Sequence, residues 1–358
     1  MDSTPTHLME LPRKILIGES VISDLGSLVR SLGPDVSSVA IITGKKVRAR
    51  AGGECADALR KESLASSWHV VSNASMETVN MLQDKLMMAG DESLPDLVIG
   101  FGGGRSVDVA KMTAFKIGRP FLSVPTSASH DGISSPFVSI RGTEKPHSVR
   151  ANTPIGVIAD TFLMSQAPQR LLAGGCGDLV GKITAVRDWE LGRDEKGEYF
   201  GSYAANLAYM SARIILAESK KLGTISQFGI RTVVEALISA GVAACIAGSS
   251  RPCSGSEHLF SHAVEYVAGP DFGLHGERVG IGTIMMARLH GLDWERIAET
   301  LSDVGAPTTA KQIGLSDEHV IMALVSAQSL RPDRHTILSR TKLDKKSARE
   351  LARATKVI

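Results

Sequence analysis

Strand and helix patterns alternate through the first 160 residues of the chain. Short apolar runs are each followed by a stretch with apolar residues at helical spacing. Because parallel strands are joined by helical crossovers, this alternation predicts a Rossmann-like parallel α/β sheet covered on both faces. The expected strands are residues 11–18, 39–42, 68–72, 96–100, 120–124, 137–140 and 155–159. The expected helices are 20–32, 47–62, 76–89 and 105–117, the first capped by Ser20.

The pattern changes near residue 164, after which few strand patterns remain. We therefore expect an α/β domain over residues 1–164 and an all-helical domain over residues 165–358. The helices expected in the second domain are 165–173, 175–191, 200–218, 227–247, 255–267, 277–290, 293–303, 307–311, 316–328 and 344–354.

Composition indicates a soluble globular protein rather than a nucleic-acid or membrane protein. The net charge of +2 is too small to attract nucleic acid or an anionic membrane. The aromatic content of 4% leaves few side chains on which bases could stack. The N-terminus lacks a basic region before an apolar core, and no uncharged apolar run approaches a membrane span. The four scattered cysteines suit a reducing compartment, so we expect a cytoplasmic protein.

A glycine-rich loop follows the strand at 96–100 and opens the next helix. It reads Gly102-Gly103-Gly104-Arg105-Ser106-Val107-Asp108. Glycines let a ligand approach the backbone, and a helix N-terminus presents free N–H groups, so the loop suits a pyrophosphate. It is not the usual G-x-G-x-x-G fingerprint, and the alternative is a tight turn without a ligand.

A polar loop, residues 125–135, follows the next strand and reads PTSASHDGISS. In a parallel sheet it emerges at the same edge as the glycine loop, where ligands bind. Its hydroxyl groups could bind phosphate, ribose or nicotinamide. An ordinary Ser/Thr loop is the alternative.

Three of the ten histidines fall in the stretch 254–282. His258 and His262 are four residues apart, so they share one face of a helix. Ser254 and Glu257 have the spacing of a capping box that would begin this helix. His275 follows a Gly/Pro-rich break. These imidazoles are candidate metal ligands, and the alternative is that they cap helices or pack in the core.

Asp178 lies in a second glycine-rich stretch, 174–182, which we expect to begin a helix. Its carboxylate is either a helix cap or an oxygen ligand that joins two histidines. One Asp and two His suit Zn²⁺ or Fe²⁺, with a position left for a substrate oxygen. Cys176 is a less favoured alternative ligand.

Together these motifs resemble the superfamily of iron-containing alcohol dehydrogenases and glycerol dehydrogenases, which includes dehydroquinate synthase. The matching segments are GGG-x-x-x-D at 102–108, PTSAS at 125–129, GDLVGK at 177–182, and EH-x-x-x-H followed by LHGERVGIG. Within it the chain looks most similar to the archaeal sn-glycerol-1-phosphate dehydrogenases, through PTSASHDGISSP, GCGDLVGK-x-TA-x-x-DW and SGSEHLFSHA. The resemblance covers nearly the whole chain and implies a dehydroquinate-synthase-like fold.

The resemblance also implies an activity. The expected reaction is the reversible, Zn-assisted reduction of dihydroxyacetone phosphate to sn-glycerol 1-phosphate by NAD(H) or NADP(H), with Fe²⁺ as another possible metal. This reaction supplies the glycerophosphate backbone of archaeal membrane lipids. The expected partners are this small substrate and further copies of the chain in a homo-oligomer, with no nucleic acid and no membrane span.

Site residues follow from the resemblance position by position. Asp178, His258 and His275 match metal ligands, while Asp131, His262 and Asp178 match catalytic positions that contact substrate. The cofactor-binding matches are Gly103, Gly104, Arg105, Ser106, Val107, Asp108, Thr126, Ser127, Ala128, Ser129 and Ser135.

Two features of ligand recognition stay open in the sequence. The substrate phosphate needs cationic or N–H donors. By location alone, its candidates are Arg141, Lys145, His147, Arg150 and Lys182. For the nucleotide, no carboxylate follows the strand at 68–72 until Glu77, and Asn73 stands where a ribose-binding acid would favour NAD(H). We therefore expect either NAD(H) or NADP(H) to be used.

Three other classes of function compete with this reading. A glycerol dehydrogenase shares the metal and hydride chemistry but holds no phosphate. A dehydroquinate-synthase-like lyase recycles NAD, and its metal set has Glu where this chain has Asp178. A non-catalytic binding protein would need a broken site, whereas all three candidate ligands are present.

Overall fold

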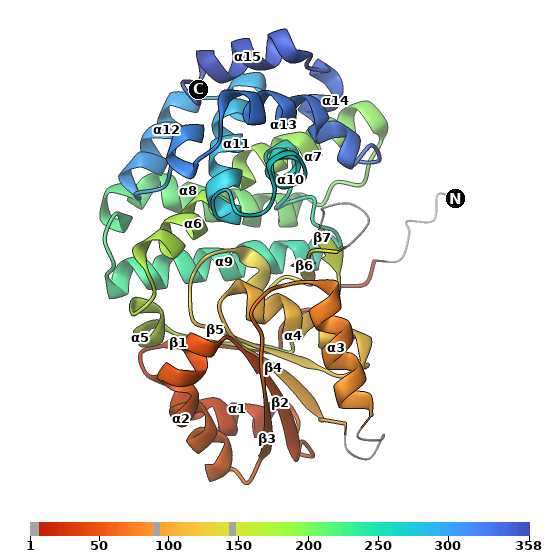
Figure 1. Ribbon diagram of the computed structural model, residues 1–358, viewed down its shortest axis with the longest axis vertical. Coiled ribbons are helices and arrows are strands. Elements are labelled where there is room, and N and C mark those ends of the chain that lie inside the picture. The colour runs from red at the N-terminus through yellow and green to blue at the C-terminus, as the bar shows by residue number, and fades with distance from the viewer. Residues whose placement is uncertain (1–6, 89–93, 143–147) are drawn as a thin grey trace.

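The computed structural model describes residues 7–88, 94–142 and 148–358. A six-stranded, fully parallel sheet in the order β1-β8-β5-β4-β2-β3 forms the N-terminal half, as predicted (Figure 1). Its strands are β1 Lys14–Gly18, β2 Ser38–Thr43, β3 Ala65–Val70, β4 Leu97–Gly102, β5 Phe121–Pro125 and β8 Gly156–Asp160. Between them lie η1 Val21–Asp24, α1 Leu25–Leu32, α2 Lys45–Lys61, α3 Met76–Met87 and α4 Gly104–Lys116.

The neighbouring strands β2 and β4 send their helices to opposite faces of the sheet. Leu59 of α2 packs with Ile41 and Ile99 on one face, while Val107 of α4 packs with Ile42 on the other. Ligands of open α/β sheets bind in the crevice outside the carboxyl ends of such strands. The loops after β2 and β4 therefore frame the ligand crevice.

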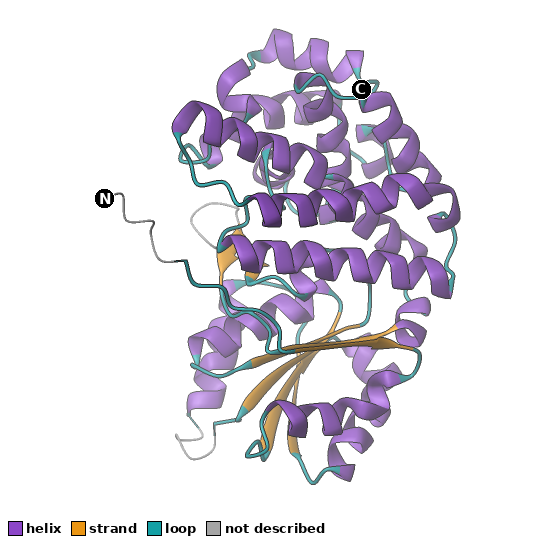
Figure 2. Cartoon of the chain, turned by 180° about the vertical axis from the view of Figure 1, so that it is seen from behind, coloured by secondary structure: helices purple, strands orange, loops and turns teal. Residues whose placement is uncertain are grey.

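After β8, the described chain contains helices and no strand (Figure 2). These helices are α5 Thr161–Ser165, α6 Gln169–Val180, α7 Lys182–Lys196, α8 Ser202–Leu222, α9 Gln227–Ala247, α10 Ser256–Ala268, α11 His275–Leu289, α12 Trp294–Asp303, η4 Ala310–Ile313, α13 Asp317–Leu330, α14 Ile337–Thr341 and α15 Lys345–Ala354. The change from an α/β half to a helical half agrees with the sequence, and the domain boundary at 164 stays a prediction.

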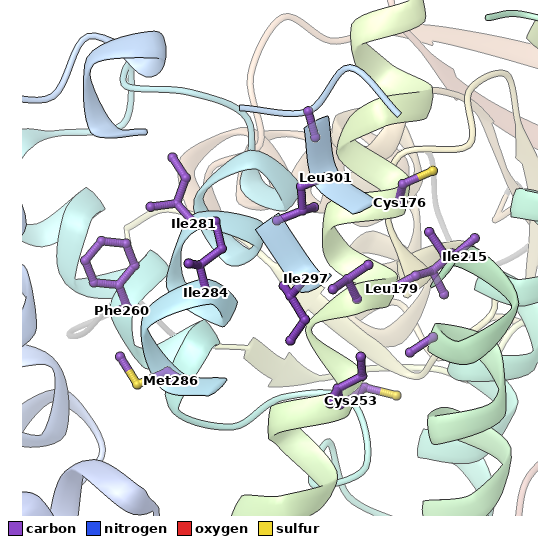
Figure 3. Close-up of a cluster of buried hydrophobic side chains, with 14 of the residues drawn as sticks. Cys176, Leu179, Ile215, Cys253, Phe260, Ile281, Ile284, Met286, Ile297 and Leu301 are labelled. Carbon is purple, nitrogen blue, oxygen red and sulfur yellow. The ribbon is translucent and has the colours of Figure 1, made fainter. Parts of the chain in front are cut away.

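One hydrophobic core fills the helical half and extends into the sheet. Figure 3 shows Leu179 of α6 among Ile281 and Ile284 of α11 and Ile297 and Leu301 of α12. The same cluster also includes four side chains from the α/β half, which are Ala128, Ile133, Val157 and Ala159. The two halves therefore share buried apolar contacts.

Helix α9 is long and apolar enough to cross a membrane by length and composition, with a mean hydropathy of 1.8. However, 67% of its most apolar window is buried inside the protein. It packs along α8 and faces the sheet (Figure 2). A core helix of this kind explains the apolar sequence without a membrane.

The helix boundary predicted at Gly174, between helices at 165–173 and 175–191, is wrong. Residues 174–177 lie inside α6, and Asp178 sits near the end of that helix rather than at its beginning. The glycines serve close packing instead: a Cβ on Gly177 would overlap the carbonyl of Gly276, and a Cβ on Gly276 would overlap that of Gly174. Helices α6 and α11 therefore cross with their backbones in contact.

Two other local predictions also differ from the structure. Ser20 does not cap α1, because it precedes η1 with a φ of 56° and makes no side-chain cap. The carboxylate of Asp160 accepts the N–H bonds of Ser20 and Ile22 instead, at 3.2 and 3.0 Å. The strand expected at 137–140 is β6 Phe137–Ser139, which pairs antiparallel with β7 Ser148–Arg150 outside the main sheet.

The capping box expected at Ser254 is also absent, because α10 begins at Ser256 with Gly255 as its N-cap. The N-terminus of α10 is capped instead by Asp188 of α7, which is distant in the sequence and fully buried. Its carboxylate accepts the Ser256 N–H at 2.6 Å and the Ile337 N–H at 2.7 Å, at the first residues of α10 and α14. The carboxylate of Asp188 therefore caps the N-termini of two helices, one of which carries His258.

We predict that Asp188→Asn lowers the free energy of unfolding by about 3 kcal/mol, because an amide cannot accept both N–H bonds without leaving a buried donor unpaired. Chemical denaturation measures the loss. Asp194→Asn on the same helix is the matched control, since Asp194 is exposed and, among the described residues, its carboxylate pairs with the neighbouring Arg193 alone. Equal stability of the two variants would contradict the capping role.

Candidate metal and nucleotide site

A cavity of about 1240 Å³ lies between the carboxyl edge of the sheet and the helical half. Gly44 after β2 and Gly103 after β4 line one end of it, and His258 and His275 line the other. The crevice predicted by the strand order and the histidine-rich stretch therefore open into one space.

Asp178, His258 and His275 come together at this cavity. The Oδ1 atom of Asp178 lies 3.4 Å from Nε2 of His258 and 3.9 Å from Nε2 of His275, and the three candidate ligand atoms all lie within 4.8 Å of one another. Asp178 is 1% exposed and His258 is 5% exposed. The predicted ligands thus form one cluster, in which Asp178 and His258 are buried and His275 is partly exposed.

The cluster fits a divalent ion. Zn²⁺ binds carboxylate oxygen and imidazole nitrogen at about 2 Å, which places neighbouring ligand atoms about 3–4 Å apart. Cys176, the alternative ligand, points into the hydrophobic cluster of Figure 3, where burial raises the pKa of its thiol to about 12.

Glu257 orients His258. Its Oε1 atom lies 2.8 Å from Nδ1 of His258, and its Oε2 atom accepts a hydrogen bond from Thr184 at 2.7 Å. A carboxylate on one ring nitrogen fixes the tautomer and leaves the other nitrogen as a ligand. Nε2 of His258 therefore faces Asp178, where a bound cation would take the place of a proton.

The surroundings of His275 favour its neutral form. Burial, followed by the charge of His258, lowers the pKa of His275 well below its usual value. A neutral imidazole is the form that binds a metal. Its place at the first residue of α11 follows from the Gly276 contact with α6.

Lys182 neutralises the acidic side of the cluster. Its Nζ atom lies 2.7 Å from Oδ2 of Asp131 and 2.9 Å from Oδ1 of Asp178, and the side chain is fully buried. Burial alone would raise the pKa of Asp178, but Lys182 and His258 hold that pKa well below its usual range. The carboxylate therefore stays ionised.

The structure also places the two other predicted catalytic residues at the cavity. The backbone N–H of Asp131 donates to Oδ2 of Asp178 at 3.0 Å, which joins the loop after β5 to the cluster. The ring of His262, one turn beyond His258, lies 6.3 Å from that of His275. Both side chains are therefore beside the candidate ligands, on the cavity side.

Nine of the eleven predicted cofactor residues line the cavity. The other two residues, Val107 and Ala128, have their side chains buried in core clusters and do not line the cavity. Gly104 begins α4 under the ring of His130, where a Cβ would overlap the imidazole. The glycine loop therefore supplies space as well as N–H groups.

A second buried lysine, which the sequence did not single out, fixes the polar loop. Lys111 of α4 donates to the carbonyls of Gly132, Ser135 and Phe137 at 2.6, 2.6 and 2.9 Å. Its regular helical position gave no sign of this role. Three such bonds hold the loop that carries Asp131.

The structure distinguishes among the residues considered as ligands of the substrate phosphate. Lys182 is fully buried and does not line the cavity, and Arg150 turns away to Glu10 at 3.4 Å. Arg141 lines the cavity. Lys145 and His147 fall outside the described residues.

We predict that His258→Ala and His275→Ala lose bound metal, because each removes one nitrogen from a three-ligand set. His262→Ala is expected to keep the metal and lose turnover about 100-fold or more, because it faces the cavity without joining the cluster. Elemental analysis of the purified variants measures the metal. Loss of metal from His262→Ala would contradict this division of roles.

Solved structures support the fold. The chain superposes on a glycerol dehydrogenase from Schizosaccharomyces pombe with a TM-score of 0.80 and 20% identity, covering 99% of this chain and 92% of that one. A probable glycerol dehydrogenase from Sinorhizobium meliloti gives a TM-score of 0.77 and 21% identity, with 98% of each chain covered. The dehydroquinate-synthase-like fold expected from the sequence is thus confirmed.

Sequence relatives are closer. A model of the iron-containing alcohol dehydrogenase family matches residues 16–168. Proteins named glycerol-1-phosphate dehydrogenase [NAD(P)+] are 54% identical in Cenarchaeum symbiosum, over 99% of this chain and 98% of the relative, and 49% identical in Nitrosopumilus maritimus, over 100% and 99%. Similarity of this extent shows that the chain is a member of the glycerol-1-phosphate dehydrogenase family.

Proposed function

We propose that the protein reduces dihydroxyacetone phosphate to sn-glycerol 1-phosphate, reversibly, with NAD(H) or NADP(H). One observation carries the proposal: a cluster of Asp178, His258 and His275 lies at the same cavity as a glycine-rich loop at a helix N-terminus. Hydride transfer from a nicotinamide to a ketone needs both parts side by side. The names of the similar archaeal proteins support this substrate.

The residues of the cavity account for the chemistry. A divalent ion held by Asp178, His258 and His275, which we propose to be Zn²⁺ rather than Fe²⁺, would supply polarisation of the substrate carbonyl. The glycine loop and the hydroxyl groups of Thr126 and Ser127 would hold the nucleotide, which fixes the face from which hydride leaves.

Two further groups would support the reaction, Lys182 from behind the cluster and His262 at the substrate. The ammonium of Lys182 keeps Asp178 ionised and holds both Asp131 and Asp178 in place, because it lies 2.7 Å from the first carboxylate and 2.9 Å from the second. His262 would donate a hydrogen bond to a substrate oxygen and move the proton that accompanies hydride transfer. The burial of these groups excludes bulk water from the reacting atoms.

The competing functions differ in what the site must hold. A glycerol dehydrogenase would use the same cluster but needs no cationic group for a phosphate. A lyase that recycles its nucleotide would show no net consumption of NADH. The archaeal relatives favour the phosphorylated substrate over both. We further propose a role in archaeal lipid synthesis, in the cytoplasm, by a homo-oligomer.

The central test is NAD(P)H oxidation with dihydroxyacetone phosphate, before and after removal of metal by a chelator. We expect turnover that is lost on chelation and restored by Zn²⁺, with a product of sn-1 configuration. No oxidation, or a product of sn-3 configuration, would overturn the proposal. Dihydroxyacetone turned over as well as its phosphate would favour the glycerol dehydrogenase reading.

The nucleotide end of the cavity is basic. Among the described residues that line it are the four cations Lys45, Lys46, Arg50 and Arg105. The carboxylates in the described lining are Asp108, which is nearly buried, and Asp131 and Glu265 on the metal side. Cations without a nearby acid accommodate a ribose 2′-phosphate, which supports use of NADP(H) as well as NAD(H).

We predict that Asn73→Asp lowers the NADP(H)/NAD(H) ratio of kcat/KM about tenfold, because a carboxylate at this rim repels a 2′-phosphate. The change is nearly isosteric, and the oxygen that accepts the Thr78 hydroxyl at 2.7 Å is retained. Steady-state kinetics with both cofactors measure the ratio. An unchanged ratio would show that residue 73 does not face the ribose.

A further inference from the structure

The cavity has a second basic group, on the side of the metal cluster. Of the Lys and Arg side chains in its described lining, four lie at the nucleotide end and two, Arg141 and Arg278, approach Glu265 of α10. Lys182 is excluded because it is buried behind Asp131 and Asp178. The metal side therefore has two guanidinium groups in its lining, of which Arg278 is largely buried, with a side chain 7% exposed, and Arg141 is the more accessible.

Arg278 is fixed in place. It lies three residues after His275 on α11, so the two side chains share one face of the helix. Its Nε atom donates to Oγ of Ser261 at 3.2 Å, and its Nη1 atom donates to two backbone carbonyls at 3.2 Å. Only Nη2 is turned to an acid, Glu265, at 3.5 Å.

Arg141 reaches the same carboxylate from the α/β half. Its backbone is anchored, since its N–H donates to the Ala74 carbonyl at 3.0 Å and its carbonyl accepts from Met76 at 2.8 Å. Its Nε atom lies 3.5 Å from Glu265, and the side chain is 52% exposed. Within the described chain, its Nη1 and Nη2 groups have no partner.

Both contacts with Glu265 are long. The Arg170–Glu277 pair nearby is joined at 2.6 Å, whereas each guanidinium here stands 3.5 Å from its acid. Charge-assisted hydrogen bonds are normally about 2.7–2.9 Å, so these donors are only weakly engaged. Two guanidinium groups and one carboxylate leave one positive charge for an anion.

The position suits a ligand that begins at the metal cluster. His258, His262 and Glu265 are spaced i, i+4 and i+7 on α10 and all line the cavity. At about 1.5 Å of rise per residue, His262 lies about 6 Å and Glu265 about 10 Å beyond His258 along the helix. In dihydroxyacetone phosphate, three bonds separate the ketone carbon from phosphorus, which places the phosphate near the level of His262 to Glu265.

We propose that Arg141 and Arg278 form the binding site for the phosphate of the substrate, and thereby select the phosphorylated ketone over the free one. This inference rests on the proposed function of the cavity. The Nη groups of Arg141 and the Nη2 group of Arg278 donate to the phosphate oxygens, and Glu265 holds the two guanidinium groups facing the cavity before the ligand arrives.

The test compares selectivity in the metal-loaded enzyme. Arg141→Gln is expected to lower the ratio of kcat/KM for dihydroxyacetone phosphate to that for dihydroxyacetone about 10- to 100-fold, the effect of losing hydrogen bonds to a charged group. Most of the loss is expected in KM for the phosphorylated substrate. Inorganic phosphate should also become a weaker competitive inhibitor by a similar factor.

Arg150→Gln is the matched control. Arg150 is a similarly exposed arginine, at 46%, but it pairs with Glu10 and does not line the cavity. It should keep the wild-type ratio. Arg141→Lys, which keeps the charge but not the forked donors, should fall between Gln and wild type.

The outcomes separate the two proposals. A wild-type enzyme that uses dihydroxyacetone phosphate, with an unchanged ratio in Arg141→Gln, would overturn the phosphate site and leave the proposed function intact. A wild type without that activity would overturn the proposed function. Calorimetric binding of inorganic phosphate would then decide the site: loss in Arg141→Gln supports it, and equal binding by both proteins rejects it.

Discussion

The close crossing of α6 and α11 is the contact on which the site depends. Gly177 and Gly276 let the two backbones touch, and the residues beside them in sequence are Asp178 and His275. A side chain at either glycine would push the helices apart and separate the two candidate ligands. The glycine stretch that looked like a helix start in the sequence is therefore what brings the acid to the histidine.

Buried charge is the second constraint. The exposed fraction is 1% or less for Asp178, Lys182 and Glu257, and each has an oppositely charged or hydrogen-bonding partner. Removing one partner from such a group leaves an uncompensated charge in a medium of low dielectric, which costs several kcal/mol. The cluster is therefore rigid because its electrostatics are mutually dependent, and a preorganised site of this kind spends little energy on rearrangement during reaction.

Local patterns were sufficient for most of the fold. Apolar periodicity predicted α9 to the residue, and the glycine and Ser/Thr loops lie at the expected sheet edge. Effects between distant residues escaped the sequence. Asp188 caps α10 from 68 positions away, and Lys111 binds carbonyls more than 20 positions further on. In the sequence, Asp188 and Lys111 each look like an ordinary residue of a helix. Their roles can therefore be identified only from the tertiary structure.

The core shared by the two halves has a consequence for how the chain folds. Ala128, Ile133, Val157 and Ala159 belong to the same buried cluster as side chains from helices of the second half. During synthesis, the α/β half emerges first and exposes these side chains until α6 and the following helices are complete. The shared core therefore makes part of the burial of the α/β half dependent on the completed helical half.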